Sequence, residues 1–176
     1  MGYTVNSIVI RKNIRDLFLI INNIDNWPQL HGYDKAELRE IEKLVDGKLK
    51  IVFRIIGKEE DEHDHNHDGE ENGHSETWIS QRIIDIKTYS ARGVRLEPIY
   101  PFKHWILDIV LSEEQEGTRM TWVQDFRMDE KTGHTDSEIE GYINKGSKEE
   151  LQIFKEKIET GTVYLKMDEA LFEDCK

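Results

Sequence analysis

Apolar residues recur along the chain with two different periods, and the period predicts which segments are strands and which are helices. Residues 3–10 predict a first strand, with Val5, Ile8 and Ile10 as its apolar positions. Asn13 can serve as an N-cap, and the apolar residues that follow it have helical spacing. This helix should stop before Asn26-Trp27-Pro28, because the residue before a proline avoids the helical region. Its apolar positions are Ile14, Leu17, Phe18, Ile21 and Ile24.

Six further segments predict a meander of strands that are separated by turn signals. They are residues 37–45, 48–56, 77–86, 88–97, 103–112 and 118–128. Asp46-Gly47 and Glu116-Gly117 are turn sequences that join two of these pairs. A long helix then runs from a cap at Asp136 or Ser137 to about Glu159. Its expected buried stripe is Ile139, Tyr142, Ile143, Leu151, Phe154 and Ile158, with Gly146 on the same side.

The order of these elements predicts an α+β domain with helices packed on one face of an antiparallel sheet. A curved sheet wrapped around the long C-terminal helix would enclose a cavity, and such cavities are common ligand sites. The length of 176 residues favours a single domain, which we expect at residues 1–160. Residues 161–176 form a tail with enough apolar residues to dock on that domain.

Strand alternation indicates which side chains face the cavity. Trp78, Ser80, Arg82 and Ile84 share one face of their strand. On a later strand the shared face carries Thr118, Met120, Trp122, Gln124 and Phe126. An arginine among aromatic residues is costly to bury without a partner, so Arg82 is a candidate for function. The alternative is an arginine at the rim of the sheet, with its stem buried and its head in water.

The charge of the chain is uneven. Its 36 acidic and 24 basic residues give a net charge of −12, and residues 59–76 hold nine of the acids, four histidines and no Lys or Arg. The remainder carries only −3. No segment is long and apolar enough for a membrane span, the N-terminus lacks a signal-peptide pattern, and no basic stripe suggests nucleic-acid binding. We therefore expect a soluble cytoplasmic protein of unknown oligomeric state.

The acidic insert at residues 59–76 contains histidines at alternating positions, His63, His65 and His67. In an extended segment all three would face one way, as a Zn²⁺ or Ni²⁺ site requires. The insert has no apolar residue to anchor such a site, so a solvated, mobile hairpin tip is the favoured interpretation and no metal is expected. The lone cysteine, Cys175, cannot form an intramolecular disulfide. A metal-responsive protein is the weakest functional interpretation.

An ordered set of segments resembles the single-domain aromatase/cyclases of bacterial aromatic polyketide pathways, of the tetracenomycin and spore-pigment type. These proteins belong to the START-like, helix-grip superfamily, which includes Bet v 1-like proteins. The resemblance covers roughly residues 3–160. The matching segments are residues 6–10, 24–30, 51–54, 78–82, 95–97, 101–102 and 117–126, followed by Asn144 and residues 158–159 in the last helix.

The resemblance implies a cavity for a linear poly-β-ketone that is carried on an acyl carrier protein and made by a minimal polyketide synthase. The family folds this chain and promotes a regiospecific aldol closure and dehydration to an aromatic first ring, without a metal or organic cofactor. Arg82, Tyr33 and Asn144 match the family's catalytic positions. The matching substrate-binding positions are Trp27, Trp78, Arg95, Phe102, Trp122 and Gln124.

The chain departs from the family pattern at three places. The Leu30–Tyr33 segment is one residue shorter, and the insert replaces a short hairpin. An aromatic position on the strand after Phe102 falls at Ile109, with Trp105 nearby. A changed lining would suit a different chain length or ring register.

The chemistry of these residue types fits an aldol closure in part. Arg82 cannot act as a base, but its fixed donors suit an enolate or alkoxide oxygen. Tyr33 could donate a hydrogen bond or pass a proton, and Asn144 could hold a carbonyl. His31 and His104 are the candidate proton acceptors. A non-catalytic binding protein for an apolar small molecule is the main alternative, because the fold alone does not decide function.

Overall fold

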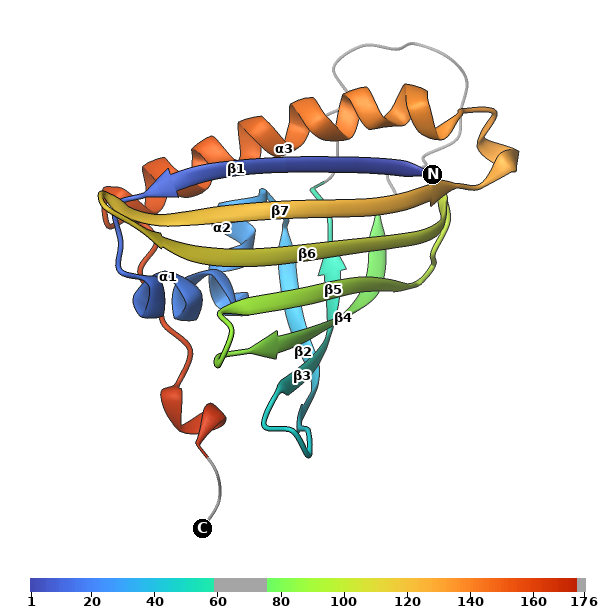
Figure 1. The fold of residues 1–176 in the computed structure, drawn as a ribbon. Coiled ribbons are helices and arrows are strands. Elements are labelled where there is room, and N and C mark those ends of the chain that lie inside the picture. Colours follow the sequence, from blue (N-terminus) through green and yellow to red (C-terminus); the bar gives the residue numbers. More distant parts are fainter. Residues whose placement is uncertain (59–75, 174–176) are drawn as a thin grey trace.

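The computed structural model describes residues 1–58 and 76–173. Seven strands form one antiparallel sheet in the order β1-β7-β6-β5-β4-β3-β2 (Figure 1). The strands are β1 (Gly2–Ile10), β2 (Lys35–Lys43), β3 (Leu49–Ile56), β4 (Thr77–Asp85), β5 (Ser90–Glu97), β6 (Phe102–Glu114) and β7 (Gly117–Met128). The helices are α1 (Ile14–Ile21), α2 (Trp27–His31) and α3 (Asp136–Glu159), with short 3-10 turns η1 (Ile24–Asn26), η2 (Glu130–Thr132) and η3 (Glu169–Phe172).

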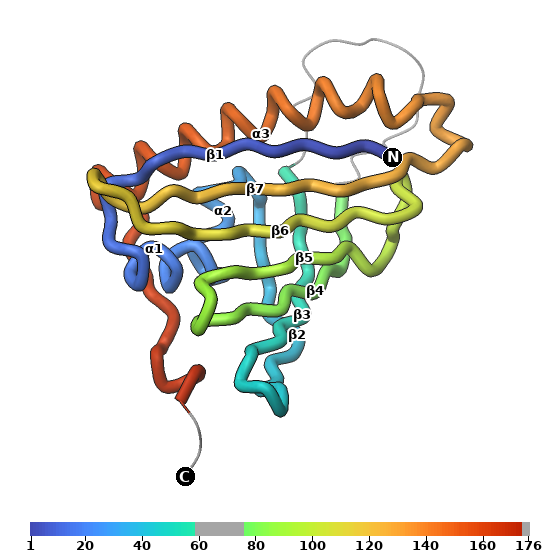
Figure 2. Tube along the Cα trace, viewed as in Figure 1, coloured from blue at the N-terminus to red at the C-terminus, as the bar shows by residue number. Residues whose placement is uncertain are grey.

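The sheet curls around the space below α3. The long helix lies along β1, and the strands turn progressively from β1 and β7 towards β3 and β2, as Figure 2 shows. Helices α1 and α2 lie at the end of the sheet where α3 finishes. The α+β fold and the curved antiparallel sheet predicted from the sequence are confirmed, and the core fills the concave side of this sheet.

The concave face is built from alternating apolar residues. In β3 the side chains of Leu49, Ile51, Phe53 and Ile55 are buried, and the residues between them are only half-buried. In β7 the same alternation buries Met120, Trp122 and Phe126. Antiparallel pairing places Arg82 of β4 between Ile51 of β3 and Gly93 of β5. The period of two in the sequence is therefore sufficient to predict the inner face of these strands.

Helix α3 begins with a capping box. Glu138 N donates to Thr135 Oγ1 at 3.2 Å, and Thr135 N donates to Glu138 Oε2 at 2.9 Å. The predicted cap at Asp136 or Ser137 was therefore wrong by one or two residues, because Thr135 has the extended backbone and the hydroxyl that the first free N–H groups require. No described helix combines the length and the hydropathy of a membrane span.

The buried stripe of α3 differs from the predicted one at two positions. Ser147, Leu151, Phe154 and Ile158 are buried, whereas Tyr142 is 76% exposed and Gly146 is exposed. Tyr142 precedes Leu151 by nine residues, which is about two and a half helical turns, so the two side chains lie on opposite sides of α3. An apolar residue near the start of the helix was wrongly included in its buried face.

The first helix stops before Asn26, as predicted, but the reason given for the stop is wrong, because Trp27, the residue before Pro28, is helical. Helix α1 ends at Ile21, and after η1 the helix α2 starts at Trp27 with backbone angles φ −67° and ψ −34°. A proline is tolerated in the first turn of a helix, where its missing N–H would have no intrahelical partner. Gly32 ends α2 with φ +72°, a left-handed conformation that a glycine adopts without strain.

The described part of the C-terminal tail, residues 161–173, packs on α1. Val163 is buried, and Met167 N donates to Leu19 O at 3.1 Å. Phe172 lies against Phe18 with ring centroids 6.0 Å apart, and Arg15 forms a two-bonded ion pair with Glu169. These contacts close the end of the core next to α1.

Candidate active site

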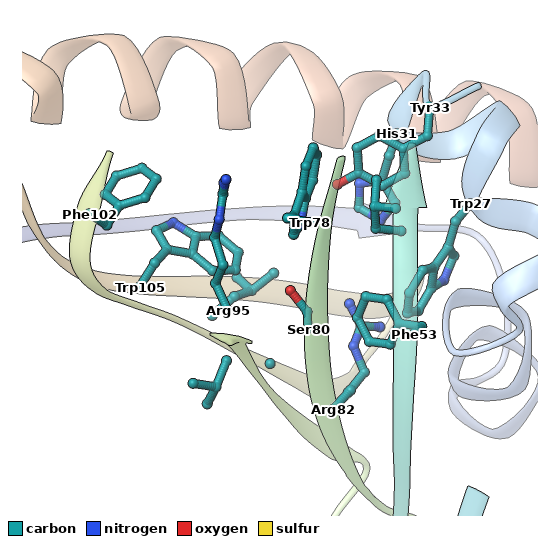
Figure 3. Close-up of a pocket in the computed structure, with 14 residues that line it drawn as sticks. Trp27, His31, Tyr33, Phe53, Trp78, Ser80, Arg82, Arg95, Phe102 and Trp105 are labelled. Atoms are coloured by element: carbon teal, nitrogen blue, oxygen red, sulfur yellow. The ribbon is translucent and has the colours of Figure 1, made fainter. Parts of the chain in front are cut away.

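A cavity of about 240 Å³ lies on the concave face of the sheet, between strands β3 to β6 and the segment that carries α2 (Figure 3). Most of its wall is aromatic or aliphatic, and the polar groups are few. It is lined by Trp27, His31, Tyr33, Phe53, Ile55, Trp78, Ser80, Arg82, Gly93, Val94, Arg95, Phe102, Trp105 and Leu107. Small side chains on β4 and β5, Ser80 and Gly93, leave this space open between larger neighbours. Such a mostly apolar space with few convergent polar groups is typical of a small-molecule site.

Arg82 reaches this cavity from β4 and is only 5% exposed. Its Nη1 donates to Asn22 Oδ1 at 3.1 Å, and its guanidinium carbon lies 4.3 Å from the centre of the Trp27 ring. Nε–H has no partner among the described residues. The alternative of an arginine at the rim with its head in water is therefore wrong.

The charge of Arg82 is poorly compensated. No carboxylate of the described residues pairs with its guanidinium, and burial lowers the pKa of Arg82 to about 10. The side chain still carries its proton at neutral pH. A buried cation without an anionic partner is costly, and a ligand oxygen that develops negative charge would offset this cost.

Tyr33 follows α2 and stands beside Arg82 in the lining of the cavity. Its ring stacks on His31 at 5.1 Å between centroids and meets Trp78 edge to face at 5.6 Å. Burial, together with the negative charge of Glu150, raises the pKa of the Tyr33 hydroxyl. Tyr33 is therefore neutral at neutral pH and available as a hydrogen-bond donor.

Arg95 lines another part of the cavity, away from Arg82, as Figure 3 shows, and its Nε and Nη2 are hydrogen-bonded. Its Nε donates to Pro98 O at 2.9 Å, and its Nη2 donates to Glu76 Oε1 at 3.1 Å and to Tyr100 O at 3.2 Å. The guanidinium also lies 4.8 Å from the centre of the Trp78 ring. The two arginines of the cavity thus differ: Arg95 has an acidic partner, and Arg82 has none.

Three residues of the predicted site lie outside the cavity lining. Gln124 Oε1 accepts hydrogen bonds of 2.8 Å from Thr4 and from Ser147, so it ties β7 to β1 and α3. Asn144 Oδ1 accepts from Asn6 Nδ2 at 2.9 Å and joins α3 to β1. Trp122 is buried between His31 and Phe154. The expectation that these side chains face the cavity differs from the structure, because α3 packs against β1 and β7 here. Gln124 and Asn144 are hydrogen-bonded between these elements, whereas Trp122 Nε1 has no hydrogen-bond partner among the described residues.

The other predicted site residues lie together in the cavity lining, beside aromatic residues that were not predicted. Trp27, Tyr33, Trp78, Arg82, Arg95 and Phe102 all line the cavity. Phe53 and Trp105 were missed, although the clean alternation of β3 marks Phe53 as inward. The aromatic position expected at Ile109 is supplied by Trp105, while Ile109 itself is in the core. Asn22, the partner of Arg82, carries no signal in the sequence because the contact spans 60 residues.

The two candidate proton acceptors occupy different places. His31 lines the cavity, and its Nδ1 is hydrogen-bonded to Glu150 Oε1 of α3. His104 is not among the lining residues, and its Nε2 is 2.7 Å from Asp125 Oδ1. Within residues 1–58 and 76–173 no group of three His, Cys, Asp or Glu side chains is placed to hold a metal. His63, His65 and His67 lie outside the described residues.

A curved antiparallel sheet, a long C-terminal helix and a cavity between them define the helix-grip, Bet v 1-like class of proteins. Two curated sequences are similar to this chain. A Streptomyces cyaneus protein, provisionally named a polyketide cyclase, is 27% identical over 158 residues, which cover 90% of this chain and 94% of that protein. A Streptomyces halstedii protein with the same provisional name is 29% identical, over 69% of this chain and 98% of that protein. No protein-family model matches the chain.

Solved structures with the same fold include aromatase/cyclases. BexL, a di-domain aromatase/cyclase from the BE-7585A biosynthetic pathway, has a TM-score of 0.71 and 15% identity over 92% of this chain, which spans 48% of the BexL chain. The Zhui aromatase/cyclase from Streptomyces sp. R1128 has a TM-score of 0.66 and 14% identity, covering 91% of this chain and 94% of Zhui. A major latex-like protein from Panax ginseng has a TM-score of 0.59 at 14% identity, over 93% of this chain and 97% of that protein. The resemblance to aromatic polyketide aromatase/cyclases, predicted from the sequence motifs, is confirmed.

Proposed function

We propose that this chain is a polyketide aromatase/cyclase, which directs the regiospecific aldol closure and dehydration that form the aromatic first ring of a poly-β-ketone. The substrate would reach it in the cytoplasm on an acyl carrier protein of a minimal polyketide synthase. The observation that carries the proposal is Arg82, a buried cation without an acidic partner in an aromatic cavity. The provisional names of the two relatives support the same reaction class.

Arg82 supplies the electrostatic part of the proposed reaction. Aldol closure moves negative charge onto an enolate oxygen and then onto the oxygen of the attacked carbonyl. The guanidinium of Arg82 lines the cavity, and its Nε–H has no hydrogen-bond partner among the described residues, so its charge can interact with such an oxygen. In a mostly apolar cavity this attraction is stronger than it would be in water. Aldol closure and dehydration are redox-neutral, so the proposed reaction needs no oxidant or reductant.

Tyr33 and the aromatic walls supply the positioning part. The neutral Tyr33 hydroxyl can donate a hydrogen bond to a substrate carbonyl. Trp27, Phe53, Trp78 and Trp105 surround the space and would restrict a flexible chain to a few bends. Holding two reacting carbons close together removes an entropic part of the barrier. Asn144 and Gln124, predicted to act on the substrate, would contribute by holding α3 against the sheet.

The size of the cavity favours closure of one ring at a time. Its volume of about 240 Å³ lies below the range of roughly 300–1,000 Å³ that is usual for ligand pockets. A long poly-β-ketone would not fit as a whole, so only the segment that closes would be enclosed. This agrees with a first-ring cyclase that acts while the rest of the chain remains outside.

Co-expression with a minimal polyketide synthase tests the proposal. The wild-type protein should convert the mixture of spontaneously cyclised products into one first-ring regiochemistry, identified by mass spectrometry and NMR. Arg82→Met should return the mixture that forms without any cyclase. Arg92→Met is the matched control. Arg92 is an exposed residue of β5 that forms an ion pair with Asp108 of β6, so this variant should give the wild-type products.

The product profiles also separate the cyclase from the alternative of a non-catalytic binding protein. If cultures with wild-type protein, Arg82→Met and no protein gave the same products, the cyclase proposal would be wrong. If, in that case, the wild-type protein still bound an aromatic product, as measured by a change in its tryptophan fluorescence, the result would favour a binding protein.

A further inference from the structure

The reaction proposed above needs a proton acceptor for the substrate methylene group, and the cavity lining offers few groups for this task. Arg82 is protonated at neutral pH, with a pKa of about 10, and burial raises the pKa of Tyr33, so neither is a base there. Arg95 is occupied by Glu76 and two carbonyl oxygens. Of the described residues that line the cavity, this leaves His31, whose neutral imidazole ring has one nitrogen with a lone pair that can accept a proton.

The ring of His31 is held rigidly. It stacks on Tyr33 and on Trp122, with centroid distances of 5.1 and 6.0 Å, and its edge contacts involve Phe154 at 5.0 Å and Trp27 at 6.0 Å. The side chain is 8% exposed. Figure 3 shows His31 and Tyr33 together at the end of the cavity that is also bounded by Trp27. A fixed ring at this place can meet a substrate in one orientation.

Glu150 determines which nitrogen of the ring is basic. An ionised carboxylate only accepts hydrogen bonds, so the hydrogen bond to Glu150 Oε1 places the ring proton on Nδ1. The lone pair is then on Nε2, which has no hydrogen-bond partner among the residues that the structure describes. The side chain of Glu150 is 30% exposed, so water reaches its carboxylate. This arrangement matches the carboxylate–histidine pair of general-base catalysis.

We infer that His31 and Glu150 form the general base of the cyclisation, with His31 as the catalytic residue and Glu150 as its positioning residue. Nε2 takes a proton from the methylene carbon, and the electron pair of that C–H bond becomes the enolate that Arg82 stabilises. The enolate carbon bonds to the attacked carbonyl carbon, and the resulting alkoxide takes the proton back from Nε2. Nε2 then removes a second proton, from the carbon that formed the new bond. The electron pair of this C–H bond forms a C=C bond as the neighbouring C–OH bond breaks, and the departing hydroxide takes the proton from Nε2 and leaves as water. This inference rests on the proposed function.

Purified protein added to a reconstituted minimal polyketide synthase tests His31. His31→Phe keeps an aromatic ring between Tyr33 and Trp122 but cannot take a proton. We expect the yield of the directed first-ring product, relative to spontaneous products, to fall by a factor of about 100 or more. His31→Gln keeps a hydrogen bond to Glu150, and its yield of the directed product should fall by the same factor. His104→Gln is the matched control, since His104 forms a similar pair with Asp125 outside the cavity lining, and it should keep the wild-type ratio.

Rescue by a second carboxylate tests Glu150. In Glu150→Gln the side-chain oxygen can still accept the hydrogen bond from Nδ1, but the negative charge that stabilises a protonated ring is lost. We expect the yield of the directed product to fall by a factor of about 10 or more, with kcat lowered and KM little changed, because Glu150 is not among the residues that line the cavity. Glu150→Asp keeps the carboxylate and should recover part of this loss. A merely structural role would instead make Glu150→Gln, which has nearly the same shape, the better tolerated of the two variants.

The outcomes distinguish the two proposals. If wild type directs ring closure and both folded His31 variants direct it equally well, the histidine base is wrong and the cyclase proposal stands. If the wild-type protein leaves the spontaneous products unchanged, the cyclase proposal is wrong, and the histidine base falls with it. Thermal unfolding of each variant identifies a loss of fold, and His31→Gln then decides the case if His31→Phe is unfolded.

Discussion

Arg82 and Arg95 show at the scale of single residues how two similar side chains acquire different tasks. Arg95 donates to a carboxylate and two carbonyl oxygens, so its contacts stabilise the fold. Arg82 has Asn22 and the face of Trp27, which satisfy its hydrogen-bonding groups only in part and supply no full negative charge. Such a residue contributes little to stability, and its burial is explained more easily by a ligand than by folding.

This difference leads to a prediction for stability. Arg82→Met should leave the free energy of unfolding within about 1 kcal/mol of wild type, because removing a buried unpaired cation offsets the lost bond to Asn22. Arg95→Met should lower it by about 1–2 kcal/mol, because its charged hydrogen bonds are lost. Urea unfolding at neutral pH measures both. A large loss in Arg82→Met together with no loss in Arg95→Met would contradict this assignment.

At the scale of elements, α3 is attached to the sheet by polar contacts as well as by its apolar stripe. Gln124 of β7 accepts hydrogen bonds from Thr4 of β1 and Ser147 of α3, and all three side chains are buried. Asn6 and Asn144 form a second link between β1 and α3. Since buried polar groups need partners, these contacts determine how α3 lies along the sheet.

Replacing Gln124 tests whether it supports the fold or the substrate. Gln124→Met should lower the free energy of unfolding by about 2 kcal/mol, because the hydroxyls of Thr4 and Ser147 lose their acceptor in the interior. The folded variant should still direct ring closure. Gln152→Met is the control, since Gln152 is on the exposed face of α3, and its effect should stay within about 0.5 kcal/mol. Full stability with lost product selectivity in Gln124→Met would assign Gln124 to substrate binding instead.

At the scale of the whole molecule, the strands on either side of the acidic insert pair with each other directly. β3 and β4 are neighbouring antiparallel strands in which Ile56 pairs with Thr77, and Gly57 N donates to Glu76 O at 2.7 Å. The strand ends on either side of residues 59–75 are therefore already aligned for a short hairpin turn. Their alignment comes from the ladder itself.

Replacing residues 59–75 with Asn-Gly should therefore leave the free energy of unfolding within about 1 kcal/mol of wild type. The product profile in the co-expression assay should also stay the same. The net charge changes from −12 to −4, so the variant should elute earlier from an anion exchanger, which confirms the deletion. Loss of product selectivity in a stable variant would show that the insert takes part in function.

The sequence alone predicts the strands, the long helix and the inward residues of β4 and β7. These features follow from local periodicity, which burial on one face of a strand or helix imposes directly. The family motifs added the aromatic residues and Arg82, most of which line one cavity. Errors arose where local patterns compete, as at Trp27, which is helical because Pro28 lies in a first helical turn, and at Tyr142, which is largely apolar but 76% exposed.

Which buried polar side chains have hydrogen-bond partners follows from the tertiary structure alone. Gln124 and Asn144 face inward by their spacing, but α3 and β1 supply their hydrogen-bond partners from distant parts of the chain. His31 and Glu150 are 119 residues apart in sequence, and Asn22 and Arg82 are 60 apart. Sequence periodicity reports which side of an element is buried, but a pairing between elements depends on how they pack. For that reason the unpaired Arg82 and the paired His31 became apparent only in the folded chain.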